Sequence, residues 1–192
     1  MVWIAIVALV AALLAGGVWW KWFQTYHLVT VKEGVLYRTG NRGMREFENT
    51  VRVVGPKTVI CLVDDKELAD PEKRMFNAEI DWLGKRGVRV ERIAVKLGGW
   101  PTTGDVRKFL EIVATPERQP VLIHCAQGVR RTGMFVAAYQ ESVLGVDKEK
   151  VKAEMPTFGH SRRTVKDIER FVEVYDPKER AVMAELEQSS EE

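Results

Sequence analysis

Short apolar runs and longer amphipathic stretches alternate along most of this chain. The runs have strand length and are rich in branched apolar residues, as in Thr58–Val63 and Pro120–His124. The stretches between them space their apolar residues as one face of a helix does. This alternation predicts an α/β fold with a mainly parallel central sheet flanked by helices. Strands are expected at 35–37, 58–63, 88–95 and 120–124, and helices at 44–54, 70–86, 102–115, 132–144, 147–154, 164–175 and 177–186.

Residue types at the helix ends support these boundaries. Asp70 and Pro71 have the form of a helix start, with Asp as the cap and Pro in the first turn. Thr102 and Asp105 have the spacing of a capping box. The last nine residues carry four glutamates and no basic residue, so we expect a frayed, solvated end there.

The N-terminal segment has a different pattern, because residues 1–20 contain no charged side chain. A helix over residues 2–20 would be about 28 Å long at ~1.5 Å per residue, close to the ~30 Å hydrocarbon core of a bilayer. We therefore predict a transmembrane helix over 1–23 and a juxtamembrane linker over 24–33. Amphipathic rings gather at the end of the apolar run, as in an interfacial belt: Trp19, Trp20, Trp22, Phe23 and Tyr26.

A cleaved signal peptide is the alternative for this segment. It is disfavoured because no basic residue precedes the apolar run and Leu13 breaks the small-x-small pattern ending at Ala15. Lys21, Lys32 and Arg38 follow the run, so the positive-inside rule predicts a single-pass membrane protein with its C-terminal domain in the cytoplasm. His27 is interpreted as a polar residue of the linker.

Composition adds mainly exclusions. The chain has 192 residues, of which 46% are apolar, and 29 basic against 27 acidic side chains give a net charge of +2. An apolar share of this size excludes a disordered chain, and two cysteines exclude a disulfide scaffold. The near-neutral balance argues against a nucleic-acid partner. The three histidines and two cysteines show no metal-site spacing, so neither a metal nor a cofactor is expected.

The candidate chemistry lies between His124 and Gly133. An apolar strand runs directly into Cys125, five residues separate it from Arg131, and Thr132 opens a helix. A loop of this length can curl so that its backbone N–H groups point inward, and Gly128 permits the positive φ that such a curl often needs. Inward N–H groups and a helix N-terminus bind phosphate-like anions, and the arginine fork matches two phosphate oxygens. The expected phosphate-binding residues are Ala126, Gln127, Gly128, Val129, Arg130 and Arg131.

The same environment favours a thiolate at Cys125. Helix N-termini and nearby cations lower a cysteine pKa from ~8.5 to ~3.5–7.5. Cys125 would then be ionised at neutral pH, and Thr132 could donate a hydrogen bond to its sulfur.

This stretch resembles the H-C-x5-R-[ST]-G signature of cysteine-based protein tyrosine and dual-specificity phosphatases, and it fits at every defined position. Gly34–Gly40, Thr58–Ile60 and Phe158–His160 also resemble segments of small bacterial dual-specificity-like phosphatases. The resemblance spans about residues 34–175 and implies a dual-specificity phosphatase-like fold. We therefore place a phosphatase domain at 34–176 and a C-terminal helix and acidic tail at 177–192.

The resemblance also implies a mechanism with a cysteinyl-phosphate intermediate. Cys125 would be the nucleophile, Arg131 would bind the phosphoryl group, and Thr132 would assist breakdown of the intermediate. His124 would orient the loop from behind through hydrogen bonds. The expected partner is a phosphorylated protein or a small anionic phosphate.

The general acid of the family has no clear counterpart. The loop over 96–101, where such phosphatases carry an aspartate, contains no carboxylate. Asp64 and Asp65 follow a strand and could reach the same sheet edge as Cys125. Asp105 is the nearest carboxylate downstream, although a capping role is favoured for it.

Several alternatives remain open from the sequence. The substrate could be a phosphotyrosine-type phosphomonoester, an inositol (pyro)phosphate or a phospholipid. A non-catalytic phosphate-binding module at the membrane belongs to another class, and a rhodanese-like sulfur transferase is disfavoured by the loop length. Cys61 is favoured as a core thiol over a redox partner of Cys125.

Overall fold

The computed structural model describes residues 3, 6, 9–10, 16–17 and 23–182, apart from the side chains of 162–164. A five-stranded sheet lies at its centre, with the strand order β1-β2-β5-β3-β4. β1 is antiparallel to β2 and every other neighbouring pair is parallel, so the predicted mainly parallel sheet is confirmed. The strands are β1 (Val29–Lys32), β2 (Leu36–Gly40), β3 (Thr58–Cys61), β4 (Arg89–Arg92) and β5 (Val121–Cys125).

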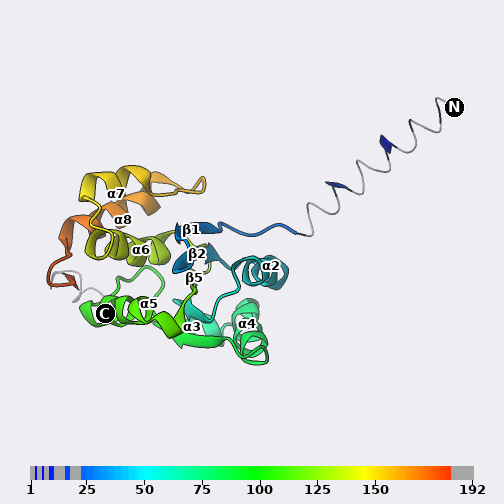
Figure 1. The fold of residues 1–192 in the computed structure, drawn as a ribbon, viewed down its shortest axis with the longest axis horizontal. Helices are drawn as coiled ribbons and strands as arrows, with labels where there is room; N and C mark the ends of the chain where they lie inside the picture. Colours follow the sequence, from blue (N-terminus) through cyan, green and yellow to red (C-terminus); the bar gives the residue numbers. More distant parts are fainter. Residues whose placement is uncertain (1–2, 4–5, 7–8, 11–15, 18–22, 183–192) are drawn as a thin grey trace.

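Helices cover both faces of the sheet (Figure 1). On one face pack α5 (Thr103–Ala114), α6 (Arg130–Ser142), α7 (Lys148–Glu154) and α8 (Arg162–Val174). On the other face pack α2 (Met44–Val54) and α4 (Met75–Gly84). A short helix α3 (Asp65–Ala69) and two 3₁₀ turns, Pro71–Lys73 and Pro116–Arg118, complete the connections.

Each central strand contributes to two cores because successive residues of a strand point to opposite faces. In β5, Ile123 faces α5 and α6, whereas Leu122 packs with Phe47 of α2 and Leu83 of α4. All five residues of β5 are buried. Such two-sided burial is typical of parallel strands covered by helices and explains the unbroken apolar run before the cysteine.

The sheet edge formed by the carboxyl ends of β2, β3 and β5 positions the candidate site. Gly40 pairs with Cys125, and Cys61 pairs with His124. The chain leaves β5 at this edge, forms the loop over 126–129 and enters α6. Ligands commonly bind at this edge of open α/β sheets.

Two predicted segments differ from the structure. The linker over 24–33 is wrong in part, because Val29–Lys32 alternates outward and inward residues and joins the sheet as β1. The helix over 177–186 is also wrong where the structure describes it. Asp176 accepts hydrogen bonds from the N–H groups of Lys178 and Glu179, and this turn returns the chain as a hairpin of β6 (Tyr175–Asp176) and β7 (Ala181–Val182).

The predicted helix over 70–86 is divided. Asp70 does cap a helical start, but only a 3₁₀ turn follows it, and α4 begins at Met75. Sequence analysis missed α3, which Asp64 caps through the N–H of Glu67.

The predicted transmembrane helix over 1–23 falls mostly outside the described residues, as does the acidic tail from 183 onward. Among the residues that are described, none belongs to a helix long and apolar enough to span a bilayer.

Candidate active site

The loop between Cys125 and Arg131 is pressed against the end of β2. Gly128 has φ 69°, the left-handed conformation expected from the sequence. A Cβ atom on Gly128 would lie 2.3 Å from the carbonyl oxygen of Thr39, so no side chain fits there. Gly40 also lies close to the loop, since a Cβ atom added to Gly40 would lie 2.6 Å from the carbonyl oxygen of Gln127.

Every carbonyl from Cys125 to Val129 is bound by a group outside the loop. The N–H of Asn41 lies 3.2 Å from the carbonyl oxygen of Cys125 and 2.9 Å from that of Ala126. The Arg38 guanidinium donates to the carbonyls of Gly128 at 2.6 Å and Val129 at 3.3 Å. The carbonyl of Gln127 accepts from His27 Nδ1 at 2.8 Å.

These contacts orient the opposite side of each peptide unit. In a trans peptide the C=O and the following N–H point in opposite directions. Carbonyls held outward therefore turn the N–H groups of residues 126–130 toward the interior of the loop. The Gly128 N–H donates to the Cys125 sulfur at 3.2 Å.

The sulfur of Cys125 is stabilised as a thiolate. Burial of the thiol opposes ionisation, but the charge of Arg131 and hydrogen bonds from Thr132 and Gly128 outweigh it and lower the pKa of Cys125. The Thr132 hydroxyl has no hydrogen-bond partner with an N or O atom in the described part of the chain. It is therefore available to the sulfur.

The guanidinium of Arg131 is buried beside the loop and held by Glu67. Both of its terminal nitrogens donate to the Glu67 carboxylate, one of them at 3.1 Å. One nitrogen also donates to the carbonyls of Val95 at 3.0 Å and Leu62 at 3.3 Å. Arg131, the predicted phosphate-binding arginine, thus lies at the loop, and α3 and the end of β3 fix the orientation of its guanidinium.

His124 lies behind the loop. Its Nδ1 is 3.4 Å from the carbonyl oxygen of Cys125, a long contact, and its Nε2 is 2.7 Å from a carboxylate oxygen of Glu79. Burial alone would lower the pKa of His124, but the Glu79 carboxylate and Cys61 raise it well above its usual value. His124 is therefore a fully buried support whose charged form Glu79 favours.

Cys61 shares a sheet face with His124, because the two residues are cross-strand neighbours. Cys125, one residue further along β5, belongs to the core on the other face. This placement does not favour a disulfide between the two cysteines. Donor atoms of Cys61, Glu79 and His124 lie within 4.8 Å of one another, and Glu79 and His124 form an ion pair within this cluster.

The side chain of Arg130 has its partners outside the loop. Its guanidinium pairs with Asp167 at 2.6 Å and donates to the carbonyls of Gly99 at 2.6 Å and Gly98 at 2.9 Å. It also lies 5.0 Å from the centroid of the Trp100 ring. Arg130 therefore fixes the loop over 98–101 against α6 and α8, and only its backbone N–H remains for the phosphate.

The three candidate general acids all have structural partners. Asp64 caps α3 through the N–H of Glu67 at 2.7 Å and also accepts from the N–H of Leu97 at 2.9 Å. Its burial opposes ionisation, but these N–H groups and Arg131 lower its pKa. Asp65 has 84% of its side chain exposed and pairs with Arg92 at 2.7 Å. Asp105 accepts from the N–H and hydroxyl of Thr102, which confirms the capping box.

Sequence analysis missed four residues that support the loop. Arg38 is 1% exposed in the middle of β2, and a charged residue inside an apolar strand was the available signal. Glu67, Asn41 and His27 gave no local signal, because their roles arise from contacts with residues far away in the chain.

A cysteine of lowered pKa at the end of a central strand, a loop that places a backbone N–H on its sulfur and an arginine at the start of the next helix are typical of the class of cysteine-dependent phosphatases. The family described as "DSP-PTPase phosphatase fused to NAD+ Kinase" matches residues 30–174, and the chain belongs to this family. The predicted resemblance is thereby confirmed.

Individual relatives agree with this assignment. The dual specificity protein phosphatase TpbA of Pseudomonas aeruginosa (strain UCBPP-PA14) is 30% identical over 103 residues, or 54% of this chain and 42% of TpbA. The chain thus matches less than half the length of this curated relative. A crystal structure of P. aeruginosa TpbA has a TM-score of 0.58 at 28% identity and covers 76% of this chain and 83% of that one.

The core catalytic domain of the PP-IP phosphatase SIW14 from S. cerevisiae shares the fold. Its crystal structure has a TM-score of 0.63 at 19% identity and covers 88% of this chain and 93% of that one.

Proposed function

We propose that the chain is a phosphatase that hydrolyses phosphomonoesters in two steps. The observation that carries this proposal is the loop itself, in which donors outside the loop bind the carbonyls of residues 125–129 and the Gly128 N–H donates to the sulfur of a cysteine of lowered pKa. In the first step the Cys125 sulfur attacks phosphorus, an S–P bond forms and the P–O bond to the leaving group breaks. In the second step water attacks phosphorus, releasing inorganic phosphate and the thiolate.

The neighbouring residues have distinct roles in this proposal. The inward N–H groups and the positive end of α6 bind the non-bridging phosphate oxygens. Arg131 stabilises the charge of the transition state, with Glu67 fixing its orientation. The Thr132 hydroxyl donates to the sulfur as it leaves in the second step.

The direct test uses the full chain in detergent with p-nitrophenyl phosphate. We expect turnover that vanadate inhibits, abolished turnover in Cys125→Ser and a severe loss in Arg131→Lys. Arg89→Lys, at an exposed position in β4, is the matched control and should retain turnover. Full activity of Cys125→Ser would refute the proposed function, and a protein that bound phosphate without turnover would be the non-catalytic module.

The state of Asp64 favours substrates with good leaving groups. A general acid contributes typically ~10²–10⁴-fold when it protonates the leaving group, and a carboxyl of lowered pKa is ionised at neutral pH. Phenols, with a pKa of about 10, and phosphates, with a second pKa of about 6, depart more readily than a serine alkoxide. Aryl phosphates are therefore the favoured phosphomonoesters, and phosphoanhydrides, to which an inositol pyrophosphate belongs, are the alternative substrate class.

A leaving-group series tests this choice. We expect Asp64→Asn to change the rates with aryl phosphates of high and low phenol pKa by the same factor. Asp65→Asn, at the exposed neighbouring position, is the control. A loss confined to poor leaving groups in Asp64→Asn would identify Asp64 as the acid and remove this substrate preference.

We also propose that the apolar N-terminal segment anchors the chain in a membrane, with the phosphatase domain on the cytoplasmic side. The uncharged run over 1–20 and the basic residues that follow it support this placement. The test is alkaline carbonate extraction of membranes from cells that express the full chain. Retention in the pellet is expected, and release of the full chain into the supernatant would contradict an anchor.

A further inference from the structure

Two residues in the left-handed region stack on each other beside the phosphate loop. His27 has φ 56° and Phe158 has φ 50°, and neither is glycine. Their rings are nearly parallel, at 11°, with centroids 4.1 Å apart. Residues other than glycine rarely adopt positive φ, and such strain persists where surrounding contacts enforce it, often at functional sites.

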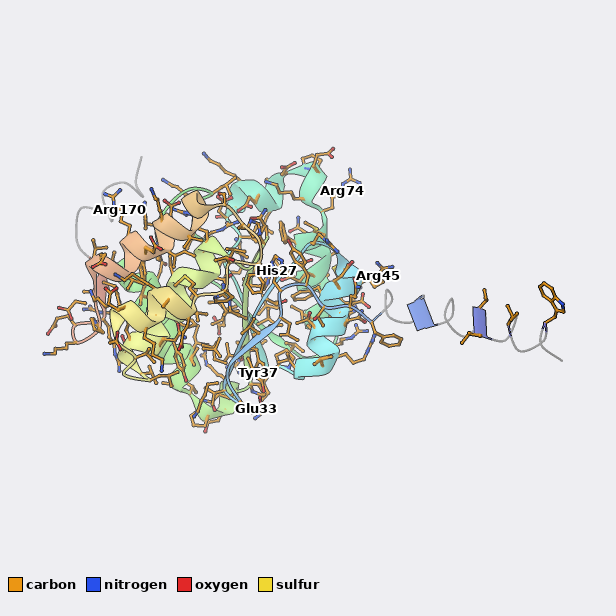
Figure 2. All side chains as sticks on the ribbon, turned by 90° about the horizontal axis from the view of Figure 1, so that it is seen from above. His27, Glu33, Tyr37, Arg45, Arg74 and Arg170 are labelled. Atoms are coloured by element: carbon orange, nitrogen blue, oxygen red, sulfur yellow. The ribbon has the colours of Figure 1, made fainter. Side chains whose placement is uncertain are left out.

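The segment that carries His27 is fixed to the domain just before this residue by backbone hydrogen bonds and just after it by the pairing of β1 with β2. The carbonyl of Tyr26 accepts hydrogen bonds from the N–H of Gly40 at 3.0 Å and the hydroxyl of Thr39 at 2.8 Å. The carbonyl of Gln24 accepts from Asn49 at 3.1 Å. Figure 2 shows this N-terminal segment crossing the domain toward Glu33, with His27 near the middle. The strained conformation of His27 is therefore imposed by its neighbours.

Two ring contacts and one hydrogen bond hold the ring of His27. It is stacked between Tyr26, with centroids 3.9 Å apart, and Phe158, and its Nδ1 reaches the carbonyl oxygen of Gln127 at 2.8 Å. Because a carbonyl only accepts, Nδ1 carries the proton. The contact joins residues 100 positions apart in the chain.

Because of the geometry of the peptide between Gln127 and Gly128, the hydrogen bond from His27 also affects where the Gly128 N–H points. The planar peptide carries the Gln127 carbonyl on one side and the Gly128 N–H on the other. The Gly128 N–H donates to the Cys125 sulfur at 3.2 Å. A group that holds the carbonyl outward therefore holds the N–H on the nucleophile.

Among the described residues, the carbonyls of the neighbouring peptides have their own donors. Asn41 binds those of Cys125 and Ala126, and Arg38 binds those of Gly128 and Val129. The carbonyl of Gln127 depends on His27. Loss of this donor would remove the one hydrogen bond that the Gln127 carbonyl receives from the described part of the chain.

We propose that His27 is a positioning residue of the phosphate loop, whose Nδ1–H holds the Gln127 carbonyl outward so that the Gly128 N–H faces the Cys125 sulfur. This inference rests on the proposed function for the catalytic importance of that N–H. It makes the segment directly after the apolar N-terminus part of the catalytic site. Binding of this segment to the domain and order in the loop are thereby coupled.

The test compares His27→Ala, His27→Asn and His27→Gln in the full chain in detergent. Asparagine carries its amide nitrogen on Cγ, the carbon that bears Nδ1 in histidine, and it tolerates positive φ. Glutamine carries its amide nitrogen one carbon further out, on Cδ. His160→Ala removes a ring that contacts His27 edge-on, at 5.8 Å, and is the matched control. The readouts are the pH dependence of Cys125 alkylation by iodoacetamide, located by peptide mass spectrometry, and kcat/KM with p-nitrophenyl phosphate.

We expect His27→Ala to raise the pKa of the Cys125 thiol and to lower kcat/KM by about five- to tenfold, the equivalent of one lost hydrogen bond. His27→Asn should recover most of both losses, and His27→Gln should not. Wild-type values in His27→Ala, or equal losses in His27→Asn and His27→Ala with unchanged thermal unfolding, would overturn the inference. The alkylation measurement remains decisive if the wild-type chain hydrolyses no phosphomonoester, which would refute only the proposed function.

Discussion

Glu67 holds both terminal nitrogens of the Arg131 guanidinium in an ion pair in which each side chain is only 5% exposed. Glu67 belongs to α3, a helix of five residues, and α3 is itself capped by Asp64. The orientation of Arg131, the proposed phosphate ligand, therefore depends on a short helix 64 positions away in the sequence.

Removal of Glu67 should affect both stability and catalysis. Glu67→Ala leaves the Arg131 charge buried without its partner, which typically costs about 3–5 kcal/mol of unfolding free energy. We expect a large fall in urea-unfolding free energy together with a reduced kcat, since Arg131 loses its fixed orientation. Glu72→Ala, an exposed glutamate just after α3, is the control. Equal effects of the two substitutions would show that the ion pair has no role in either property.

Gly128 should tolerate no side chain. Gly128→Ala meets two penalties, the cost of positive φ for an L-residue, about 1–2 kcal/mol, and a Cβ 2.3 Å from the Thr39 carbonyl oxygen. We expect loss of turnover with p-nitrophenyl phosphate and a lowered Tm. Gly55→Ala is a matched control, because Gly55 has φ 59° and nothing lies within 4 Å of its Cβ position. A Tm loss in Gly128→Ala no larger than in Gly55→Ala would contradict the close approach of β2 to the loop.

Glu141 should make stability depend on pH. It lies on α6, both of its carboxylate oxygens lack hydrogen-bond partners among the described residues, and burial raises its pKa to about 7. The folded-state pKa lies above the unfolded value of about 4.3, so the folded state binds the proton of this carboxyl more tightly than the unfolded chain does. The resulting stabilisation is fully present below the unfolded pKa of about 4.3. It is lost as the pH rises through about 7.

Glu141→Gln removes this dependence. At pH 8 we expect the unfolding free energy of the variant to exceed that of wild type by about 2 kcal/mol, a value reduced from the full pKa shift because solvent partly screens the group. Near pH 4 the two unfolding free energies should be equal. Urea unfolding across this range measures the difference. Glu111→Gln, on the exposed side of α5, should show no such trend. A difference that stayed constant with pH would exclude titration of Glu141 as the cause.

The sequence predicts those parts of the site that depend on residues close together in the chain. The buried strand, Cys125, the left-handed Gly128 and the start of α6 are all encoded within ten residues, and the capping box at Thr102 within four. The mainly parallel sheet followed from the alternation of strands and helices.

What the sequence could not predict are the contacts that the fold makes between distant segments. Arg38 and His27 reach the loop across 90 and 100 positions. His27 was interpreted as part of a linker because it follows an apolar segment. Arg130 is expected among the phosphate-binding residues of the loop, and the sequence does not show that its side chain pairs with Asp167 of α8.

In the proposed mechanism Cys125 becomes covalently phosphorylated during turnover. To test this step, the full chain is mixed with p-nitrophenyl phosphate and the reaction is stopped with denaturant within one turnover. The mass of the peptide that carries Cys125 is then determined. We expect one phosphoryl group on this peptide, none on the peptide with Cys61, and none on either in Cys125→Ala. Turnover without this intermediate, or phosphate release that persists in Cys125→Ala, would contradict it.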